Sequence, residues 1–176
     1  KIGKIAIAHN GNVVNAVELR RAMELDGSIF RSTTDSEVIL HLIARSRAGT
    51  IEEMIVEALS KVRGAFSLVF LTKDRVIAAR DPHGFRPLCL GRLGDAHVVA
   101  SESCALDIIG AEYQREVAPG ELCVLGGDGP QFMRWSEPAA KLNRCIFEFI
   151  YFSRPDSRVF GENVDKVRRM LGRRLA

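Results

Sequence analysis

The feature that most constrains the fold is a group of short apolar segments in the middle of the chain. From Gly64 onward, runs of strand-forming residues alternate with turn signals, and we expect strands at residues 65–71, 75–80, 87–91 and 97–100. The segments Leu68-Val69-Phe70-Leu71 and Val76-Ile77 are continuously apolar. A strand with one face in water shows alternation, so these runs predict an antiparallel sheet buried on both faces.

Helical patterns precede this region. A strand at residues 4–9 leads into a helix at 13–25 that stops at Gly27, and two further helices end near Arg45 and at residue 62. Thr34 and Glu37 have the spacing of a capping box, and Thr50 begins the third helix. After the hairpins we expect a short helix at 104–109, strands at 112–117 and 121–125, and a Gly-rich turn at 126–129. Helices followed by antiparallel hairpins predict an α+β fold.

Length and composition fit one domain with a short extension. The 176 residues carry a net charge of +3 and are 27% charged, as is usual for globular domains. Residues 136–140 have the composition of a boundary, which divides the chain into a first domain at 1–140 and the start of a second at 141–176, with a last helix at 164–175. No apolar run approaches the roughly 18 residues of a membrane span, so we expect no membrane contact and a cytoplasmic location.

The positions of the basic residues and of the cysteines limit which ligands the chain can be expected to bind. Lys and Arg cluster between residues 144 and 174, where a solvated helix face is favoured over binding of nucleic acid or phosphate. The cysteines have no CxxC spacing and are expected to be reduced thiols; they are Cys89, Cys104, Cys123 and Cys145. By default Cys145, on an apolar segment, is a buried thiol.

The first strand runs into His9, Asn10 and Gly11, a pattern with a chemical interpretation. Hydrolysis of a carboxamide needs donors aimed at the developing oxyanion. The side-chain amide of Asn10 and the backbone N–H of Gly11 could both point at one oxygen, and Gly11 lacks a Cβ that would keep a substrate away. The alternative is an ordinary Asn-Gly turn. His9 is more readily explained as a hydrogen-bonded packing residue than as a base.

Asp35 is the candidate for binding a substrate ammonium group. Thr34 and Glu37 would supply the helix cap and leave the charge of Asp35 free, although stabilisation of the helix dipole is the alternative. The segment 80–88 reads as a rigid turn with an Asp-Arg ion pair nearby, and Glu102 is expected to anchor that loop or cap the short helix.

Taken together, these motifs resemble the class II glutamine amidotransferases of the N-terminal-nucleophile type. The motifs occur in the family's order and are Ala8-His9-Asn10-Gly11-Asn12, Thr34-Asp35-Ser36-Glu37, residues 80–88 and Ala100-Ser101-Glu102. Residues 101–111 and 145–157 look characteristic of one branch, the amidophosphoribosyltransferase family. The resemblance implies a four-layer αββα fold, an oxyanion hole formed by Asn10 and Gly11, and binding of the glutamine α-ammonium by Asp35.

The same resemblance implies parts that residues 1–176 do not supply. In the family an N-terminal Cys is the nucleophile, whereas this sequence opens with Lys1, so we expect a fragment that is inactive alone. A second domain would bind phosphoribosyl pyrophosphate with Mg²⁺. In cluster-containing members a Cys at the position of Cys145 is one of four ligands to a [4Fe-4S] cluster. The full-length protein is expected to be a homo-oligomer, a tetramer.

The activity implied is formation of 5-phosphoribosylamine from glutamine and phosphoribosyl pyrophosphate, the first step of de novo purine synthesis. Two alternatives stay open at this point. One is the glutaminase domain of asparagine synthetase, which residues 151–157 disfavour. The other is a catalytically silent domain of the same fold, which the missing Cys permits and which the joint presence of Asn10, Gly11 and Asp35 argues against.

Overall fold

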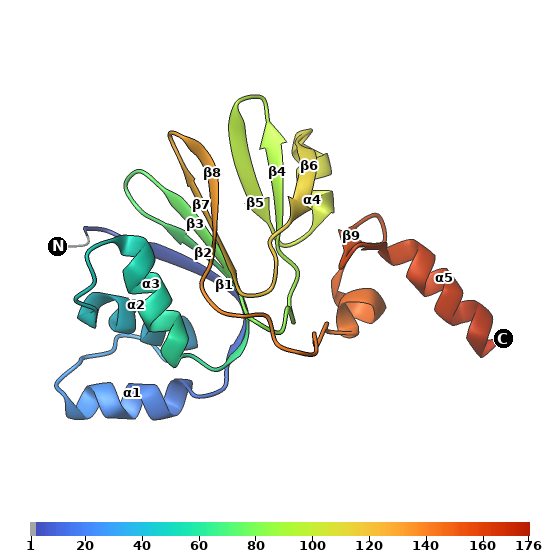
Figure 1. The fold of residues 1–176 in the computed structure, drawn as a ribbon. Helices are drawn as coiled ribbons and strands as arrows, with labels where there is room; N and C mark the ends of the chain where they lie inside the picture. Colours follow the sequence, from blue (N-terminus) through green and yellow to red (C-terminus); the bar gives the residue numbers. More distant parts are fainter. Residues whose placement is uncertain (1–2) are drawn as a thin grey trace.

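Two stacked sheets between layers of helix form the body of the molecule. The structure, a computed structural model, describes residues 3–176. The larger sheet is antiparallel and contains, in spatial order, β1 (Ala6–Val13), β2 (Gly64–Leu71), β3 (Val76–Arg80), β7 (Glu121–Gly126) and β8 (Gly129–Arg134). The smaller sheet has the order β5 (Ala96–Ala100), β4 (Cys89–Leu93), β6 (Glu112–Glu116). Figure 1 shows the two sheets side by side with helices on their outer sides.

Helices cover the outer face of each sheet. The larger sheet is covered by α1 (Ala16–Leu25), α2 (Asp35–Arg45) and α3 (Ile51–Lys61), whereas α4 (Ser103–Ile109) packs on the smaller sheet. Three apolar cores separate the layers, and the middle one, between the sheets, is built from Ala78, Leu88, Leu90, Val117 and Cys123. The predicted four-layer αββα arrangement is confirmed.

The register of β3 explains the unbroken apolar runs. Ile77 and Ala79 belong to the core under the helices, whereas Ala78 between them belongs to the core between the sheets, and all three are fully buried. Successive side chains of a strand point to opposite faces, so a strand in a middle layer needs apolar residues at every position. The continuously apolar runs in the sequence therefore follow from the position of these strands between two other layers.

The C-terminal segment returns across the domain before it leaves it. Backbone N–H groups of Ala139, Asn143 and Cys145 donate to the carbonyls of Pro82, His83 and Phe85. The short helix η1 (Glu148–Phe152), the hairpin of β9 (Arg158–Val159) and β10 (Glu162–Asn163), and α5 (Val164–Leu175) follow. The division into domains at residue 140 stays a prediction.

Several predicted elements need correction at the start of the chain. Asn10 and Gly11 do not form a turn, because β1 continues through them to Val13 and pairs with β2 in unbroken register. The first helix accordingly begins at Ala16 instead of residue 13.

The strand β8 was missed altogether, since only the Gly-rich turn before it was predicted. The helices predicted at 51–62 and 164–175 are confirmed within one residue.

The two predicted helix caps have opposite outcomes. Thr50 and Glu53 form a reciprocal capping box at α3. Thr34 is the residue before α2, but its side chain makes no capping bond. Glu37 instead accepts hydrogen bonds from the backbone of Arg31 and Ser32, at 2.7 and 2.8 Å. The capping box predicted from Thr34 and Glu37 is therefore wrong, because Glu37 holds the preceding loop.

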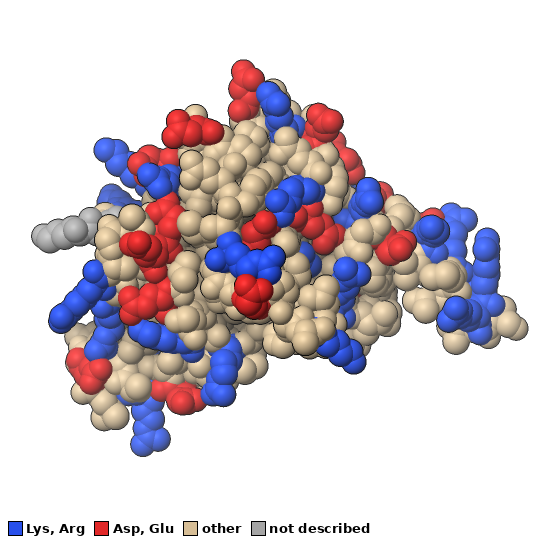
Figure 2. Space-filling view, viewed as in Figure 1, with Lys and Arg blue, Asp and Glu red and all other residues tan. Residues whose placement is uncertain are grey.

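The visible surface is mixed in charge. In Figure 2, Lys and Arg are interspersed with Asp and Glu over the body of the domain, and cationic side chains gather on the projecting α5 at the right. No helix within residues 3–176 is long and apolar enough to cross a membrane.

Candidate active site

The edge of β1 is where the predicted site residues meet. In an antiparallel sheet the N–H and C=O of one residue point to the same neighbouring strand. Phe66 directs both toward Asp81, whose carboxylate accepts its N–H at 3.2 Å and whose N–H donates to its carbonyl at 2.9 Å. Gly11 lies opposite Phe66 on the other side. The N–H of Gly11 therefore points away from β2, toward the outer edge of the sheet that the described strands form.

Val13 confirms this orientation. It lies two residues after Gly11 in the same strand, and its N–H donates to Asp35 Oδ2 at 2.9 Å across the outer edge. Two residues along a strand cover about 6 to 7 Å. The Gly11 N–H and the Asp35 carboxylate thus face the same edge at a separation comparable with the length of an extended five-carbon amino acid.

Gly11 is required for a different reason from the one that the sequence suggested. Its φ is +144°, and a Cβ at this position would collide with the backbone carbonyl of Ala65 in β2. The absence of a side chain therefore allows β1 and β2 to approach each other, and the open N–H is a consequence of that pairing.

Asp35 does not have the free charge that was predicted. Besides Val13, its carboxylate contacts His9 Nδ1 at 3.2 Å, and Ser36 Oγ lies 3.4 Å from the same oxygen. An ionised carboxylate offers about four acceptor positions. The contacts with Val13, His9 and Ser36 engage part of this capacity. The side chain is one-quarter exposed, which leaves it accessible.

The carboxyl group of Asp35 is held in its ionised form. Partial burial raises its pKa, but the hydrogen bond from Val13 and the attraction and hydrogen bond of His9 outweigh that effect, so the pKa lies below its ordinary value. An anion at the edge of β1 is suited to bind an ammonium group.

Asn10 and His9 point to opposite faces of β1. Asn10 pairs with Ser67, which pairs with Arg80, so these three side chains share the face between the two sheets. His9 lies on the helix side, where its side chain is only 5% exposed and its Nε2 has no hydrogen-bond partner among the described residues. The prediction that His9 is a packing residue matches its burial, and its contact with Asp35 makes it part of the site's support.

The loop after β3 is fixed from within by Asp81. This fully buried carboxylate accepts the N–H groups of Phe66, His83 and Phe85. Burial raises the pKa of Asp81, and the three backbone donors work against that rise. The turn is held by hydrogen bonds from its backbone to the Asp81 carboxylate.

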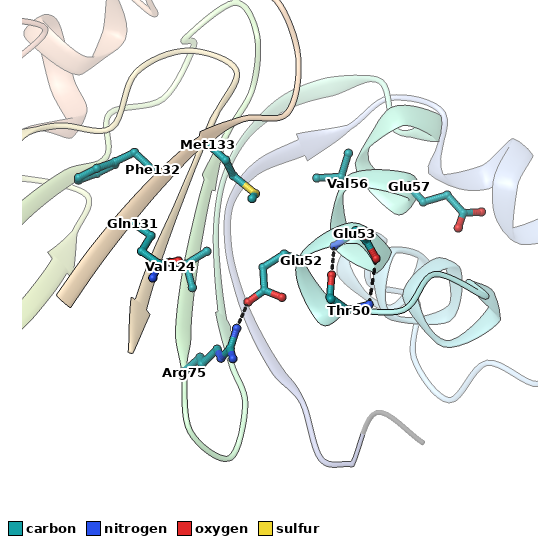
Figure 3. Close-up of a pocket in the computed structure, with 10 residues that line it drawn as sticks. All are labelled: Thr50, Glu52, Glu53, Val56, Glu57, Arg75, Val124, Gln131, Phe132 and Met133. Atoms are coloured by element: carbon teal, nitrogen blue, oxygen red, sulfur yellow. Dashed lines mark hydrogen bonds and ion pairs between the residues drawn. The ribbon is translucent and has the colours of Figure 1, made fainter. Parts of the chain in front are cut away.

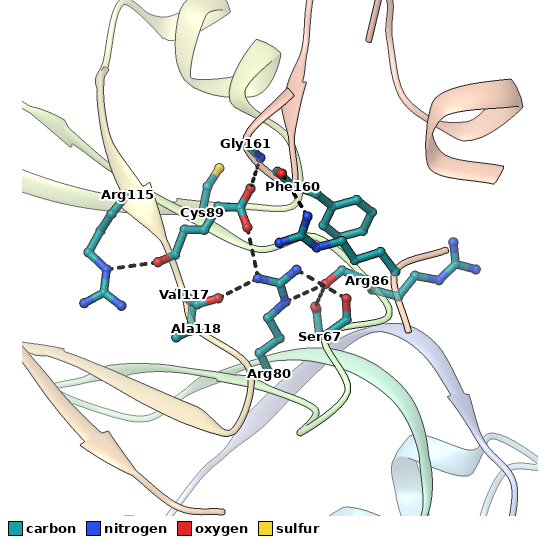
Figure 4. Close-up of polar contacts among 12 residues, drawn as sticks. Ser67, Arg80, Arg86, Cys89, Arg115, Val117, Ala118, Phe160 and Gly161 are labelled. Carbon is teal, nitrogen blue, oxygen red and sulfur yellow. Dashed lines mark hydrogen bonds and ion pairs between the residues drawn. The ribbon is translucent and has the colours of Figure 1, made fainter. Parts of the chain in front are cut away.

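The Asp-Arg ion pair expected beside this loop is replaced by two longer-range pairs. Figure 4 shows the polar contacts around Arg80. Arg80, with 3% of its side chain exposed, pairs with Glu116 at 3.2 Å and donates to the carbonyls of Arg86 and Val117 at 2.8 and 2.7 Å. Arg86 pairs with Glu148 at 2.8 Å. Sequence reasoning missed Glu116 because 36 residues separate it from Arg80 and no local pattern marks it.

Glu102 joins the two segments that were singled out as characteristic of one branch. Its carboxylate accepts the N–H of Arg154 at 2.9 Å and the hydroxyl of Ser157 at 2.7 Å. Ser103 Oγ accepts the N–H of Arg158 at 2.7 Å. Both roles predicted for Glu102 are wrong, because its side chain makes no capping bond at α4 and it anchors Arg154 and Ser157 instead of the loop at 80–88.

The cysteines are free thiols with different surroundings. Cys89, Cys104 and Cys123 are buried, whereas Cys145 is partly exposed beside Phe85. Burial raises the pKa of Cys89 to about 12 and that of Cys123 to about 11. No cluster of three or more potential metal-ligating side chains occurs in residues 3–176. Within this range Cys145 could supply one thiolate to a metal cluster, and the other ligands would have to come from outside it.

A separate groove lies between α3 and the far edge of the larger sheet (Figure 3). It has a volume of ≈ 640 Å³, and its lining includes Glu52, Arg75, Val56 and Met133. Glu52 and Arg75 form an ion pair across it. Neither Asn10, Gly11 nor Asp35 lines this groove, so it is not the proposed glutamine site.

Comparison with known proteins defines the class. Residues 1–107 match the family model described as a glutamine amidotransferase domain. The match covers more than half of the chain, and the αββα layers and the edge of β1 agree with it. The chain therefore belongs to the glutamine amidotransferase domain family.

The particular proteins that it resembles are amidophosphoribosyltransferases. The chain is 47% identical over 176 residues to amidophosphoribosyltransferase of Bacillus subtilis, covering 99% of this chain and 36% of the relative. It is 51% identical over 180 residues to chloroplastic amidophosphoribosyltransferase 3 of Arabidopsis thaliana, covering 100% of this chain and 33% of the relative. The chain thus spans about a third of the length of these relatives.

Solved structures agree. The fold matches B. subtilis glutamine phosphoribosylpyrophosphate amidotransferase, complexed with ADP and GMP, with a TM-score of 0.91 and 46% identity over 97% of this chain and 37% of that chain. A class-II glutamine aminotransferase domain protein of Silicibacter pomeroyi matches with a TM-score of 0.56 and 18% identity over 75% of this chain and 66% of that chain, which shows a shared fold alone.

Proposed function

We propose that the protein containing this chain forms 5-phosphoribosylamine from glutamine and phosphoribosyl pyrophosphate, the first step of de novo purine synthesis. In this proposal the domain hydrolyses the glutamine amide to glutamate and ammonia. Ammonia then displaces pyrophosphate from phosphoribosyl pyrophosphate in a second domain. The similarity to amidophosphoribosyltransferases along the whole chain supports this assignment.

One observation carries the glutaminase part of the proposal. The outer edge of β1 presents the N–H of Gly11 and, two residues along, the Asp35 carboxylate bound to Val13. The amide oxygen of glutamine would lie at Gly11 with the side chain of Asn10 as a second donor, and its α-ammonium would lie at Asp35. Preorganised donors of this kind stabilise the oxyanion without reorganising during the reaction.

The nucleophile is assigned to the whole protein. We take it to be the thiol of an N-terminal Cys whose own α-amino group is the base, as the family resemblance implies. The cysteines at 89, 104, 123 and 145 lie inside the chain and have no free α-amino group.

Substitution of Asp35 by Asn tests the assignment in the full-length protein. We expect the KM for glutamine to rise about 10- to 150-fold, which corresponds to loss of one charge-assisted hydrogen bond of about 1.5–3 kcal/mol. Ammonia-dependent synthesis should stay unchanged, because it bypasses Asp35. Asp26→Asn is the matched control, since Asp26 is an exposed acid that pairs with Arg45 on the surface.

Two results would contradict the proposal in different ways. Equal losses of glutamine- and ammonia-dependent rates in Asp35→Asn would remove Asp35 from the glutamine site. Asparagine as the product of the wild-type protein would identify an asparagine synthetase, and no glutaminase activity in a protein with its N-terminal Cys in place would identify a silent domain.

The remaining parts of the proposal concern the whole protein. Mg²⁺ would be bound with phosphoribosyl pyrophosphate in the second domain, and a [4Fe-4S] cluster would take Cys145 as one of four ligands. The protein is proposed to be a cytoplasmic homotetramer that binds neither nucleic acid nor membranes. Metal analysis and sedimentation of the full-length protein test these assignments directly.

A further inference from the structure

The tip of the hairpin formed by β9 and β10 has an unusual backbone. Val159 pairs with Glu162, so Phe160 and Gly161 form a two-residue turn, with φ of 54° and 84°. Turns of this kind favour an Asn-Gly sequence, because both central residues need a positive φ. Within residues 3–176, Phe160 is the only residue other than glycine with a positive φ. A bulky side chain in this conformation is strained, and such strain persists only where the surroundings hold it.

The surroundings of Phe160 hold its ring. The residue is 4% exposed, and its ring packs edge-on against Phe149. The guanidinium carbons of Arg80 and Arg144 each lie 5.6 Å from the ring centre, within the range of a cation–π interaction. Figure 4 shows Phe160 beside Arg80, which belongs to β3 of the larger sheet. The ring therefore attracts one cation of the domain and one of the C-terminal segment.

The ring also lies beside two like charges. Burial lowers the pKa of Arg80, and the positive charge of Arg144 lowers it further. Glu116 offsets part of this repulsion, since one of its oxygens pairs with Arg80 at 3.2 Å and the other accepts the N–H of Gly161 at 2.9 Å. Backbone strain and repulsion between the two cations both favour release of the hairpin tip, and burial of the Phe160 ring opposes them.

The segment at 139–163 is attached to the domain largely through polar contacts. Its apolar residues Val159 and Phe160 form a small core with Val164 that is separate from the three cores of the layered domain. Its backbone N–H groups donate to the domain at six positions, which are Ala139, Asn143, Cys145, Arg154, Arg158 and Gly161. We call these six N–H groups the docked N–H groups. A contiguous segment that shares few apolar contacts with its neighbours can open as one unit.

We propose that the hairpin tip is a latch. While the ring of Phe160 is seated against Arg80, residues 139–163 are held on the domain. When the ring leaves, this segment detaches as one unit and the two sheets stay folded. The proposal is independent of the glutamine chemistry proposed above.

The latch also determines how firmly α5 is held. The helix follows β10 directly. Within it, Arg168 donates to the carbonyls of Phe149 and Ser153 at 2.6 and 2.8 Å, which ties α5 to η1. Release of the hairpin tip would therefore free η1 and α5 together.

Hydrogen exchange of the full-length protein, measured by mass spectrometry, tests the latch without any substitution. In the wild-type protein the docked N–H groups should exchange together, and faster than the paired N–H groups of β2 and β3. Exchange of the docked N–H groups at the rate of β2 and β3 would show that the segment opens only with the sheets, and would overturn the proposal.

The variant Phe160→Asn separates the ring from the turn. Asn adopts the left-handed conformation readily, so the turn is kept while the ring is lost. We expect the docked N–H groups to exchange about 10- to 100-fold faster, because loss of a buried ring outweighs relief of the strain. The exchange of β2 and β3 should not change. Phe132→Asn is the matched control, since Phe132 lies in β8 with the Arg115 guanidinium 4.2 Å from its ring centre.

Three results with these variants would overturn the proposal. Unchanged or slower exchange of the docked N–H groups in Phe160→Asn would mean that the ring does not hold the segment. Equal acceleration in Phe132→Asn would mean that loss of any such ring has the same effect. Equal acceleration of β2 and β3 would mean that Phe160 supports the whole domain.

Trypsin cleavage supplies an independent readout. The N–H groups of Arg154 and Arg158 are bound to Glu102 and Ser103 while the segment is held on the domain. Cleavage after these two arginines requires the open segment, so its rate follows the population of the open form. The rate should rise in Phe160→Asn by the same factor as the exchange, and an unchanged rate would contradict the latch.

Discussion

Replacement of Arg80 by Met should destabilise the domain by about 3 kcal/mol. Met keeps the length of the side chain and removes every donor. The carbonyls of Arg86 and Val117 then lose their bonds of 2.8 and 2.7 Å, and Glu116 loses its cation. Breaking a buried ion pair by removing one partner costs about 3–5 kcal/mol. The lower end applies, because Glu116 is one-quarter exposed and still accepts the N–H of Gly161.

Urea unfolding of the 176-residue chain measures this loss. Trp135 is the only tryptophan in the sequence, and its indole N–H donates to the carbonyl of Arg80 at 3.1 Å, so its fluorescence reports on the affected region. Arg63→Met is the matched control. Arg63 pairs with Glu18 at the same 3.2 Å but is about three-quarters exposed, and its loss should cost about 0–1 kcal/mol. A cost below about 1 kcal/mol for Arg80→Met, or equal costs for both variants, would refute the reasoning.

Two further predictions concern titration and reactivity. The hydroxyl of Ser32 and the N–H of Arg31 lower the pKa of Glu37 to about 2, so its stabilising contribution is present above the ordinary carboxyl pKa and is lost as the pH falls toward 2. Carbon-detected NMR titration should show this value, and Ser32→Ala should raise it; an unchanged pKa would contradict the assignment. Alkylation at pH 8 should modify Cys145 before Cys89 and Cys123, whose pKa values burial raises to about 12 and about 11. Mass spectrometry identifies the order, and earlier labelling of a buried thiol would argue against this packing.

The layered architecture could be predicted because a strand buried on both faces needs an apolar residue at every position. Continuously apolar segments such as residues 68–71 reflect burial on both faces, and this signal is local in sequence. The prediction of a turn at Asn10-Gly11 was wrong. It relied on the turn propensity of two adjacent residues, whereas their pairing with Ser67 and Phe66 depends on residues far away in the sequence. Tertiary pairing overrode the dipeptide preference.

The two Thr-x-x-Glu motifs show the same limit. Thr50 and Glu53 cap α3 as the spacing predicts, whereas Glu37 turns to the backbone of Arg31 and Ser32. Nothing in the four-residue motif distinguishes them, because the competing donors belong to the loop that precedes α2. For the site, the residue types and their order were predictable, but the use of the Asp35 carboxylate by Val13 and His9 required the fold.

The outer edge of β1 has a further consequence for the solubility of the protein. A sheet edge with unpaired N–H groups is a template to which a strand of another molecule can add, and proteins protect such edges with charged groups. Asp35 places an anion on this edge and occupies the N–H of Val13. The carboxylate that we assign to substrate recognition therefore also places a negative charge at the edge where a strand of another molecule could add.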